Sequence, residues 1–259
     1  MKAVILAAGR GTRIERVTQG KPKCLLAFGD RTILDYQIDA LWDVGVSKIA
    51  IVIGHNGHCI VDHVRAAHRH RLGKLHFVLN PEFGRTNNIY SLWLARDWVG
   101  ASDFLCLNAD VLCHPRILVP AAAPKSCVSM IVDPEWRDET MKVVIQGGNV
   151  VHMSKAITRA EYSATYIGIT AFSRRITLDL FEEIEAQIRQ GRVDEFFNAA
   201  VERLIERGVR VGYTTTAGLP WAEIDDEADL HFANTEIYPR LLRVATEREE
   251  SSALVAAPV

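Results

Sequence analysis

The turn that ends the first apolar run constrains the fold more than any other stretch of the chain. Residues 3–6 are apolar, two alanines follow, and Gly9 and Gly11 come next. Small residues and glycines let a backbone turn tightly after a buried strand and point its N–H groups at an anion. The cations Arg13 and Lys23 follow closely and would attract that anion. The alternative interpretation is an ordinary turn between a strand and a helix.

Two common phosphate-binding motifs do not describe this turn. It does not have the G-x-x-x-x-G-K-S/T spacing of the P-loop, and it lacks the third glycine of the dinucleotide fingerprint. A P-loop NTPase and a typical dinucleotide-binding protein are therefore excluded.

The charge of the chain excludes one class of partner. The 30 Lys and Arg nearly balance the 32 Asp and Glu, so the net charge is −2. Nucleic acids and anionic membranes are bound through an excess of basic residues, which this chain lacks. We expect neither as a partner, so that any phosphate chemistry must be confined to one site.

Length and composition favour one large folded unit. With 259 residues and 48% hydrophobic content, the chain can bury a sizeable core, and we expect one catalytic domain over residues 1–250 and a frayed tail at 251–259. Five cysteines without a C-x-x-C pair indicate reduced thiols. No apolar run reaches the roughly 18 residues of a membrane span, and no signal-peptide pattern opens the chain. We expect a cytoplasmic protein, and nothing in the sequence excludes a homodimer.

Strand and helix patterns alternate through the first half of the chain. Apolar strand-like runs at 3–6, 47–53, 74–79 and 103–107 are separated by helical patterns at 32–44, 58–72 and about 88–98. This alternation predicts an α/β fold with a doubly wound, mostly parallel, Rossmann-like sheet, whose ligands lie beyond the carboxyl ends of the strands. Gly9, Asn87 and Asp110 all fall at those ends.

The pattern changes near residue 125. Short strands are predicted at 126–132, 141–145, 150–153 and 164–172, and a glycine pair joins the second to the third as a hairpin. We therefore expect an inserted antiparallel lobe at about 125–172. Two helices at 174–190 and 194–207, a strand at 209–214 and a last helix ending near Arg248 follow.

Histidines and arginines gather on the predicted helix at 58–72. The cluster could bind a metal ion, but a solvated helical face explains it without aligned ligands, and we favour that interpretation. It contains His63, His68, Arg69, His70 and Arg71.

The opening loop resembles a known signature. Residues 6–13 read L-A-A-G-R-G-T-R, and Pro22-Lys23 follows, as in the nucleotidyltransferases that make nucleotide sugars and CDP-alcohols. The resemblance implies a nucleotide site and assigns catalytic roles to Arg13, Lys23 and Lys155. The nucleotide-binding residues that it implies are Leu6, Ala7, Ala8, Gly9, Gly11, Thr12, Arg13, Lys23, Asn87, Asn88, Ser91, Asn108 and Asp110.

Two aspartates are candidate metal ligands. Asp110 follows the fourth strand and Asp225 lies in an E-I-D segment; each alone could simply cap a helix. The resemblance implies that together they hold Mg²⁺, which prefers oxygen ligands. Glu223 and Asp226 lie beside Asp225 and leave the second ligand open.

Two lysines lie on the predicted hairpin. Solvated surface positions are the usual fate of lysine. The resemblance implies instead that Lys155 steers the phosphate of an acceptor, and it leaves Lys142 open as a second phosphate contact.

One sequence element points to a particular branch of these nucleotidyltransferases. Asn87-Asn88-Ile89-Tyr90-Ser91-Leu92 is similar to the phosphocholine cytidylyltransferase branch, and the side-chain amides could pair with a pyrimidine edge. This implies transfer of CMP from CTP to a small phosphonate or phosphate, with release of pyrophosphate. The alternatives are a sugar-1-phosphate nucleotidyltransferase using UTP or dTTP, and a non-catalytic nucleotide-sensing subunit.

The acceptor pocket has aromatic and charged candidates. Aromatic faces could form a box for the quaternary ammonium of phosphocholine. Cations predicted near the same mouth favour a compact acceptor with an extra anionic group, and we favour that second interpretation. The aromatic candidates are Tyr90, Trp93, Trp136, Tyr166 and Trp221, the cations are Arg85, Arg137, Lys142 and Arg159, and Glu223 is a further acceptor-binding candidate.

Overall fold

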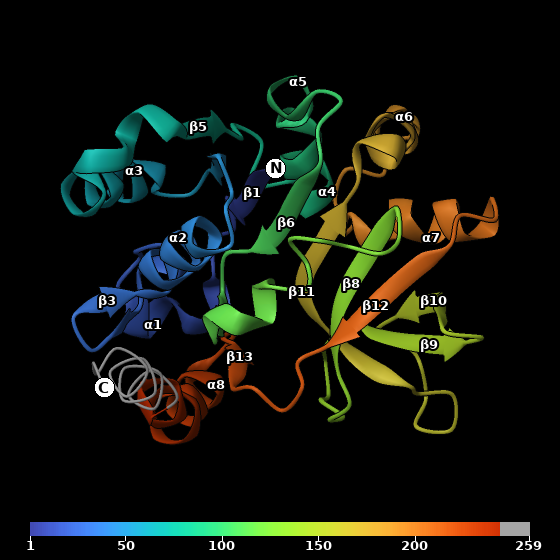
Figure 1. Ribbon diagram of the computed structural model, residues 1–259. Coiled ribbons are helices and arrows are strands. Elements are labelled where there is room, and N and C mark those ends of the chain that lie inside the picture. Colours follow the sequence, from blue (N-terminus) through green and yellow to red (C-terminus); the bar gives the residue numbers. More distant parts are fainter. Residues whose placement is uncertain (244–259) are drawn as a thin grey trace, which may run out of the picture.

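A nine-stranded mixed sheet forms the centre of the protein, and the computed structural model describes residues 1–243 (Figure 1). The strand order is β5-β4-β1-β6-β11-β8-β12-β10-β9. The bounds are β1 Lys2–Ala7, β4 Lys48–Ile53, β5 Leu75–Leu79, β6 Phe104–Asn108, β8 Val128–Asp133, β9 Lys142–Gln146, β10 Asn149–Ser154, β11 Ala164–Phe172 and β12 Val211–Thr215.

The first half of the sheet is parallel, as the sequence predicts. β1 lies between β4 and β6 and is parallel to both, and β5 pairs with the other side of β4, also in parallel. Alternate residues of β1 face two separate cores. Val4 packs on the side of α4, α6 and α7, and Ile5 packs on the side of α2 and α3. Both faces are buried, which is why these strands are continuously apolar.

Helices cover both faces of this sheet. The longer ones are α2 Ile33–Asp43, α3 Gly57–Ala67, α4 Asn88–Leu94, α6 Arg174–Arg189 and α7 Asn198–Glu206. Short helical turns complete them: η1 Thr12–Ile14, α1 Glu15–Thr18, η2 Lys23–Leu25, η3 Arg69–Lys74, α5 Arg96–Val99 and η4 Pro115–Leu118. The fold class predicted from the sequence is confirmed.

The predicted lobe continues the main sheet. β11 is buried along its whole length and runs antiparallel between β6 and β8, so it connects the parallel half to the strands of the lobe. β9 and β10 form the predicted hairpin, and β9 also pairs with the first residues of β11. The lobe strands therefore extend one sheet, in which only β12 and β8 pair in parallel beyond β11.

Several predicted helices differ from the observed ones. The helix expected at 58–72 ends at Ala67 and continues as η3, and the one expected to reach Trp98 breaks between α4 and α5. Near the end, α8 Glu227–Phe232 leads into the π-helical turn η5 Ala233–Ile237. The expected helix end at Arg248 and the expected tail at 251–259 lie outside the described residues.

Two short strand pairs were not predicted. β7 Val111–Cys113 pairs with β13 Trp221–Glu223, and β2 Ala27–Phe28 pairs with β3 Arg31–Thr32. Strands this short leave no periodic pattern in a sequence.

Within residues 1–243, no helix has both the length and the apolar character that crossing a membrane requires.

Two of the clustered histidines turn inward. His63 Nε2 and His68 Nε2 each lie 2.8 Å from Oδ1 of Asp35, whose other oxygen accepts from Thr32 N at the start of α2. His68 is only 4% exposed, so the predicted solvated face is wrong for this residue. The buried carboxylate draws the histidines inward and joins α3 to the N-terminus of α2.

We expect Asp35→Asn to destabilise the fold by about 1–3 kcal/mol, because it removes the charge that accepts these hydrogen bonds. Burial would raise the pKa of Asp35, but the hydrogen bonds from His63, His68 and Thr32 outweigh it and hold the pKa far below its usual 3.8. The contribution is therefore present above about pH 4 and is lost as the pH falls toward the folded-state pKa. Urea unfolding of both proteins at several pH values measures this.

Asp43→Asn, at the exposed end of α2, is the control and should change the free energy of unfolding by less than about 0.5 kcal/mol. Equal stability of wild type and Asp35→Asn at neutral pH would contradict the role given to Asp35.

Candidate functional site

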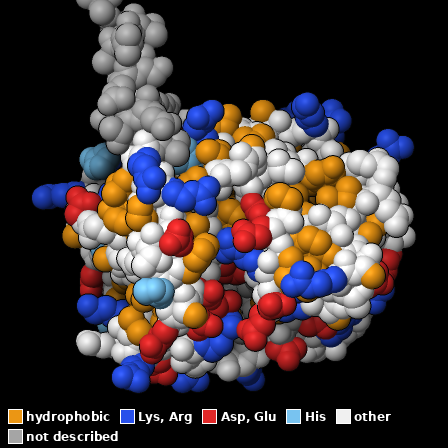
Figure 2. All heavy atoms as spheres, turned by 90° about the horizontal axis from the view of Figure 1, so that it is seen from below, with side chains coloured by type: hydrophobic (Ala, Val, Ile, Leu, Met, Phe, Trp, Pro, Cys, Tyr) orange, Lys and Arg blue, Asp and Glu red, His pale blue; other side chains and the backbone are white. Residues whose placement is uncertain are grey.

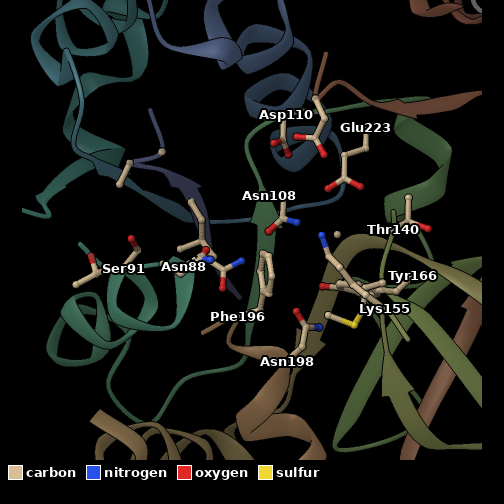
Figure 3. A pocket seen from close by; sticks show the side chains of 18 of the residues that line it. Asn88, Ser91, Asn108, Asp110, Thr140, Lys155, Tyr166, Phe196, Asn198 and Glu223 are labelled. Atoms are coloured by element: carbon tan, nitrogen blue, oxygen red, sulfur yellow. Dashed lines mark hydrogen bonds between the residues drawn. The ribbon is translucent and has the colours of Figure 1, made fainter. Parts of the chain in front are cut away.

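A pocket opens beyond the carboxyl ends of β1 and β6, where the doubly wound sheet predicts a ligand. Figure 3 shows Asn88 and Ser91 of α4 on one side of it and Glu223, Thr140, Lys155 and Tyr166 on the other. The lining residues are Leu6, Ala8, Gly9, Arg13, Asn80, Phe83, Thr86, Asn87, Asn88, Ser91, Asn108, Asp110, Thr140, Met141, Lys155, Tyr166, Gly168, Phe196, Asn198, Glu223 and Asp225.

The unpredicted β7–β13 pair brings the two candidate metal ligands together. Val111 is paired with Glu223, and one step further along Ile224 N donates to the carbonyl of Asp110 at 3.0 Å. Asp110 directly precedes β7 and Asp225 comes two residues after the end of β13, so both lie at the same end of the strand pair. Two short strands thus join segments that are far apart in the sequence.

Lys23 lies between these two carboxylates. Its Nζ is 2.8 Å from Asp110 Oδ2 and 2.7 Å from Asp225 Oδ1. Burial lowers the pKa of Lys23, but the two carboxylates outweigh burial and raise it above its usual 10.5. Gly11 makes room for this lysine: its φ is +62°, and a Cβ there would lie 2.7 Å from Lys23 Cγ.

Arg13 is the second cation of the cluster. Its guanidinium lies 2.8 Å from Asp225 Oδ2 and 3.1 Å from Glu139 Oε2. Burial would raise the pKa of Asp225, but Lys23 and Arg13 outweigh it and hold the pKa below its usual 3.8. Two cations that suit phosphate are thus held at the loop by carboxylates.

Glu223 is the third carboxyl group at this end of the pocket. Its burial, and then the charges of Asp110 and Asp225, raise its pKa to about 8. The raised pKa makes Glu223 easier to protonate than an ordinary glutamate, which limits the negative charge of the cluster.

The carboxylates have the chemistry that a magnesium ion needs. Oδ1 of Asp110 is buried and has no hydrogen-bond partner among the described residues, and Asp225 supplies a second carboxylate close by. Residues 1–243 contain no group of three or more His, Cys, Asp or Glu arranged to hold a metal. Mg²⁺ can be bound by one or two carboxylates when phosphate oxygens and water complete its octahedron, so the residues fit the ion.

Asp226 has a different task from Asp225. Its carboxylate accepts from Ala228 N and Asp229 N, at 2.8 and 2.9 Å, and caps α8. Of the two aspartates, only Asp225 lines the pocket.

Of the residues predicted to be catalytic, to bind nucleotide or acceptor, or to hold a metal, most line the pocket and seven do not. Ala7 packs into the core on the side of α2 and α3, and Lys23 lies behind the lining, between Asp110 and Asp225, with Gly11 against it. Thr12 is exposed at the start of η1. Tyr90 packs on Trp93 with ring centroids 5.4 Å apart. The remaining two are Trp136 and Lys142. The further candidates for the mouth of the acceptor pocket do not line it either: Trp93, Trp221, Arg85, Arg137 and Arg159.

Lys142 and Trp136 belong to a cluster beside the pocket. Lys142 is 2% exposed, and its Nζ lies 3.1 Å from the carbonyl of Thr140 and 4.7 Å from the centre of the Trp136 ring. Arg159 and Tyr162 also contact that ring. The structure therefore does not bring the predicted acceptor contacts of Lys142, Trp136 and Tyr90 into the pocket.

Eight lining residues were not among the predicted site residues. Two of them left a signal in the sequence: Asn80 directly follows the strand β5, and Gly168 is a glycine within the buried strand β11. Phe196 and Asn198 had none, because the segment before α7 and the first residue of α7 are brought to the site by hydrogen bonds between that segment and the start of α4. The others are Phe83, Thr86, Thr140 and Met141.

The family of the chain follows from a match over most of its length. Residues 3–175 match the model of the MobA-like NTP transferase domain, which is more than half of the sequence. The chain belongs to the MobA-like NTP transferase family. The resemblance noted in the opening loop is confirmed, and the protein is a nucleotidyltransferase enzyme.

Two curated relatives of this NTP transferase have CMP or CTP in their names. CTP:phosphoglutamine cytidylyltransferase of Campylobacter jejuni is 26% identical over 89% of this chain and 98% of its own. CMP-5'-(3-aminopropyl)phosphonate synthase of Streptomyces rubellomurinus is 28% identical over 92% of this chain, but only 39% of the relative is covered.

A solved structure agrees on the fold. The inositol-1-phosphate CTP transferase of T. maritima matches this NTP transferase with a TM-score of 0.79 over 94% of this chain and 95% of its own, at 21% identity. At this level of identity the likeness shows that the two chains share a fold.

We expect Lys23→Met to destabilise the fold, because it leaves the partly buried Asp110 and Asp225 without their shared cation. The free energy of unfolding should fall by about 1–3 kcal/mol. Removing one partner of a fully buried ion pair costs about 3–5 kcal/mol, and the effect here should be smaller because both carboxylates retain some exposure. Asp225 has a lowered pKa and Lys23 a raised one, so the contribution is fully present between about pH 4 and 10.5. It declines as the pH falls from there toward the folded-state pKa of Asp225, or rises toward that of Lys23.

Urea unfolding near neutral pH and near pH 3 measures the difference, and exposed Lys21→Met is the matched control. A cost that is the same at both pH values would show that Lys23 stabilises the fold by packing alone.

Proposed function

We propose that this NTP transferase is a cytidylyltransferase, which transfers CMP from CTP to a small phosphonate or phosphate and releases pyrophosphate. The observation that carries the proposal is a single pocket with cations and carboxylates at one end and neutral amides at the other. The two relatives named for CTP or CMP match most of this chain, which supports the same reaction.

The reaction requires positioning rather than proton transfer. An anionic oxygen of the acceptor attacks the α-phosphorus of CTP, the bond from that phosphorus to the bridging oxygen breaks, and pyrophosphate leaves with the electron pair. The attacking oxygen is already ionised, so no general base is needed. Such transfers are accelerated mainly by alignment and by neutralisation of charge.

The cations of the pocket have distinct roles in this reaction. The backbone amides of residues 9–12 and the guanidinium of Arg13 bind the leaving pyrophosphate. Lys23 contacts the α-phosphate, and Lys155 on the opposite wall orients the acceptor (Figure 3). Substrate phosphates would replace the carboxylates that Arg13 and Lys23 now contact.

Asp110 and Asp225 are the residues that would hold Mg²⁺. When bound, the ion would neutralise charge on the triphosphate oxygens. The same two carboxylates already hold a cation, the ammonium of Lys23, so their environment accepts positive charge.

The acceptor is best described as a compact, anionic molecule. Trp136 lies outside the pocket and its ring already contacts Lys142 and Arg159, which disfavours a choline box built on it. Within the pocket, the Lys155 ammonium lies 4.9 Å from the centre of the Phe196 ring and occupies that aromatic face. We therefore favour a small phosphonate or phosphate, with phosphocholine as the nearest rival.

The surroundings of the pocket are consistent with a small-molecule substrate. Figure 2 shows basic and acidic side chains interspersed over one face of the protein. We retain as proposals that the enzyme is cytoplasmic, that it has no nucleic-acid partner, and that it can form a homodimer.

Pyrophosphate release with CTP, UTP and dTTP against a panel of acceptors tests the function. The panel contains phosphonoformate, 2-hydroxyethylphosphonate, 2-aminoethylphosphonate, phosphocholine and glucose-1-phosphate. We expect turnover with CTP and a phosphonate or small phosphate. Turnover only with UTP or dTTP and the sugar phosphate would overturn the proposal, and nucleotide binding without any turnover would indicate a sensing subunit.

The metal assignment predicts a loss of activity without a loss of structure. Asp110→Asn and Asp225→Asn should each lower turnover by about a hundredfold or more, because an amide cannot balance the charge of an ion–triphosphate complex. EDTA should have the same effect on the wild type, reversed by added Mg²⁺.

Asp226→Asn is the matched control, since asparagine still caps α8 and the side chain lies outside the pocket. Turnover should stay within about threefold of wild type. Wild-type turnover by Asp110→Asn would remove that residue from the metal site.

A further inference from the structure

We propose that Gln37, a buried side chain of α2, is a positioning residue that holds Asp110 in the place where it can bind Mg²⁺. The inference rests on the proposed function, because it takes Asp110 as a metal ligand, and deepens it by naming the group that orients this ligand. Gln37 is not among the described residues that line the pocket, so it acts through the backbone that carries Asp110.

Gln37 lies in the core although its side chain is an amide. It is on the buried face of α2, with Leu34 and Leu41 one turn to either side, and it is only 2% exposed. Burial of an amide is unfavourable unless its hydrogen bonds to water are replaced. The groups that Gln37 contacts must therefore account for its place.

The amide nitrogen of Gln37 is bonded to the turn that contains Asp110. Nε2 donates to the carbonyl of Asn108 at 2.8 Å and to the carbonyl of Val111 at 2.9 Å. Asn108 ends β6 and Val111 begins β7, so the two carbonyls stand on either side of the Ala109-Asp110 turn. A single amide group thus spans the turn and restrains both of its ends.

The amide can face the turn in only one way. A carbonyl oxygen accepts hydrogen bonds and cannot donate, so a flipped amide would place Oε1 of Gln37 against two acceptors and lose both bonds. In the observed orientation Oε1 is buried and has no hydrogen-bond partner within residues 1–243. The two carbonyls of the turn therefore set the orientation of the amide.

The position of the Asp110 carboxylate depends on this turn. Its Oδ2 contacts the ammonium of Lys23 at 2.8 Å, but its Oδ1 is buried without a partner in the described part of the chain. A metal ion that binds Asp110 would compete with Lys23 for the carboxylate. The backbone then has to keep the ligand in place.

Three contacts hold the backbone of the turn. Ala109 N donates to the carbonyl of Leu6 at 3.3 Å, Ile224 N donates to the carbonyl of Asp110 at 3.0 Å, and Gln37 joins the two ends. Of these three contacts, only that of Gln37 comes from a side chain. It alone can be removed by a substitution.

A displaced turn affects Mg²⁺ more than it affects a larger ion. Mg²⁺ requires near-ideal octahedral geometry with oxygens at about 2.0–2.1 Å, whereas Ca²⁺ accepts a variable number of ligands in flexible arrangements. A carboxylate that has moved should therefore weaken binding in Mg²⁺ selectively. A general loss of stability would affect binding in both metals equally.

Gln37→Met tests the inference, because it keeps the length of the side chain and removes the amide. Isothermal titration calorimetry without an acceptor measures the dissociation constant of CTP in excess Mg²⁺ and in excess Ca²⁺. We expect Gln37→Met to weaken CTP binding about 10-fold in Mg²⁺, and by less than about threefold in Ca²⁺. The ratio of the two constants reports on the metal site.

Gln187→Met is the matched control. Gln187 on α6 is 1% exposed, its Nε2 donates to Glu183, and its Oε1 also has no partner within residues 1–243. It does not line the pocket. The same substitution should lower the stability measured by urea unfolding, but it should leave the ratio within about twofold of wild type.

Gln37→Glu keeps the test available if Gln37→Met does not fold. It has the same shape, but a carboxyl group offers at most one donor where the amide offers two, so the ratio should shift in the same direction. Equal weakening of CTP binding in the two metals would show that Gln37 has only a structural role and would overturn the inference. Wild-type affinity in Mg²⁺, or the same selective shift in Gln187→Met, would also overturn it.

The titrations do not depend on the identity of the base or of the acceptor. If the panel assay shows turnover with UTP or dTTP instead of CTP, that nucleotide replaces CTP in the calorimeter, and the failure of the proposed function leaves the inference standing. Wild-type binding that is as tight in EDTA as in Mg²⁺ would remove the metal from Asp110 and overturn the inference alone.

Discussion

The site depends on one antiparallel contact between two three-residue strands. β7 and β13 carry Asp110 and Asp225 to the same place, and the backbone bond from Ile224 to Asp110 fixes their separation. Two carboxylates so close would repel each other, and Lys23 offsets this by contacting both. The cation therefore has a structural task before substrate arrives. Gly11 makes this position of Lys23 possible, because any larger residue would displace the Lys23 side chain.

At the charged end of the pocket, the cations that suit phosphate are already held in ion pairs. Arg13 contacts Asp225 and Glu139, and Lys23 contacts Asp110 and Asp225. Phosphates must compete with these carboxylates, so part of the intrinsic attraction between cation and phosphate is offset when substrate binds. These ion pairs keep the side chains of Arg13 and Lys23 aligned at the loop. A cation that binds Asp110 and Asp225 would free both side chains for phosphate, so the affinity for nucleotide should depend on that cation.

The sequence was sufficient to predict the elements with strong hydrophobic patterns. It was not sufficient where contacts between distant segments determine the structure. Strand 164–172 and the parallel half of the sheet follow from continuous apolar runs, and the strand-end positions of Gly9, Asn87 and Asp110 place them at the pocket. Nothing local marks β13 as a partner of β7. Nor does a motif reveal that Lys142 is buried beside Trp136, because a lysine enters a core only when carbonyls and an aromatic ring receive its ammonium.

The segment before α7 is tied to the start of α4 by three backbone groups. Asn87 N donates to Val193, Ile89 N donates to Glu195, and Phe197 N donates to the side chain of Asn88. The same segment carries Phe196, whose ring lies under the Lys155 ammonium on the far wall of the pocket. Two opposite walls of the pocket therefore share one piece of backbone. A substitution in residues 192–197 that moves Phe196 would also move the start of α4, so the two walls cannot be reshaped independently.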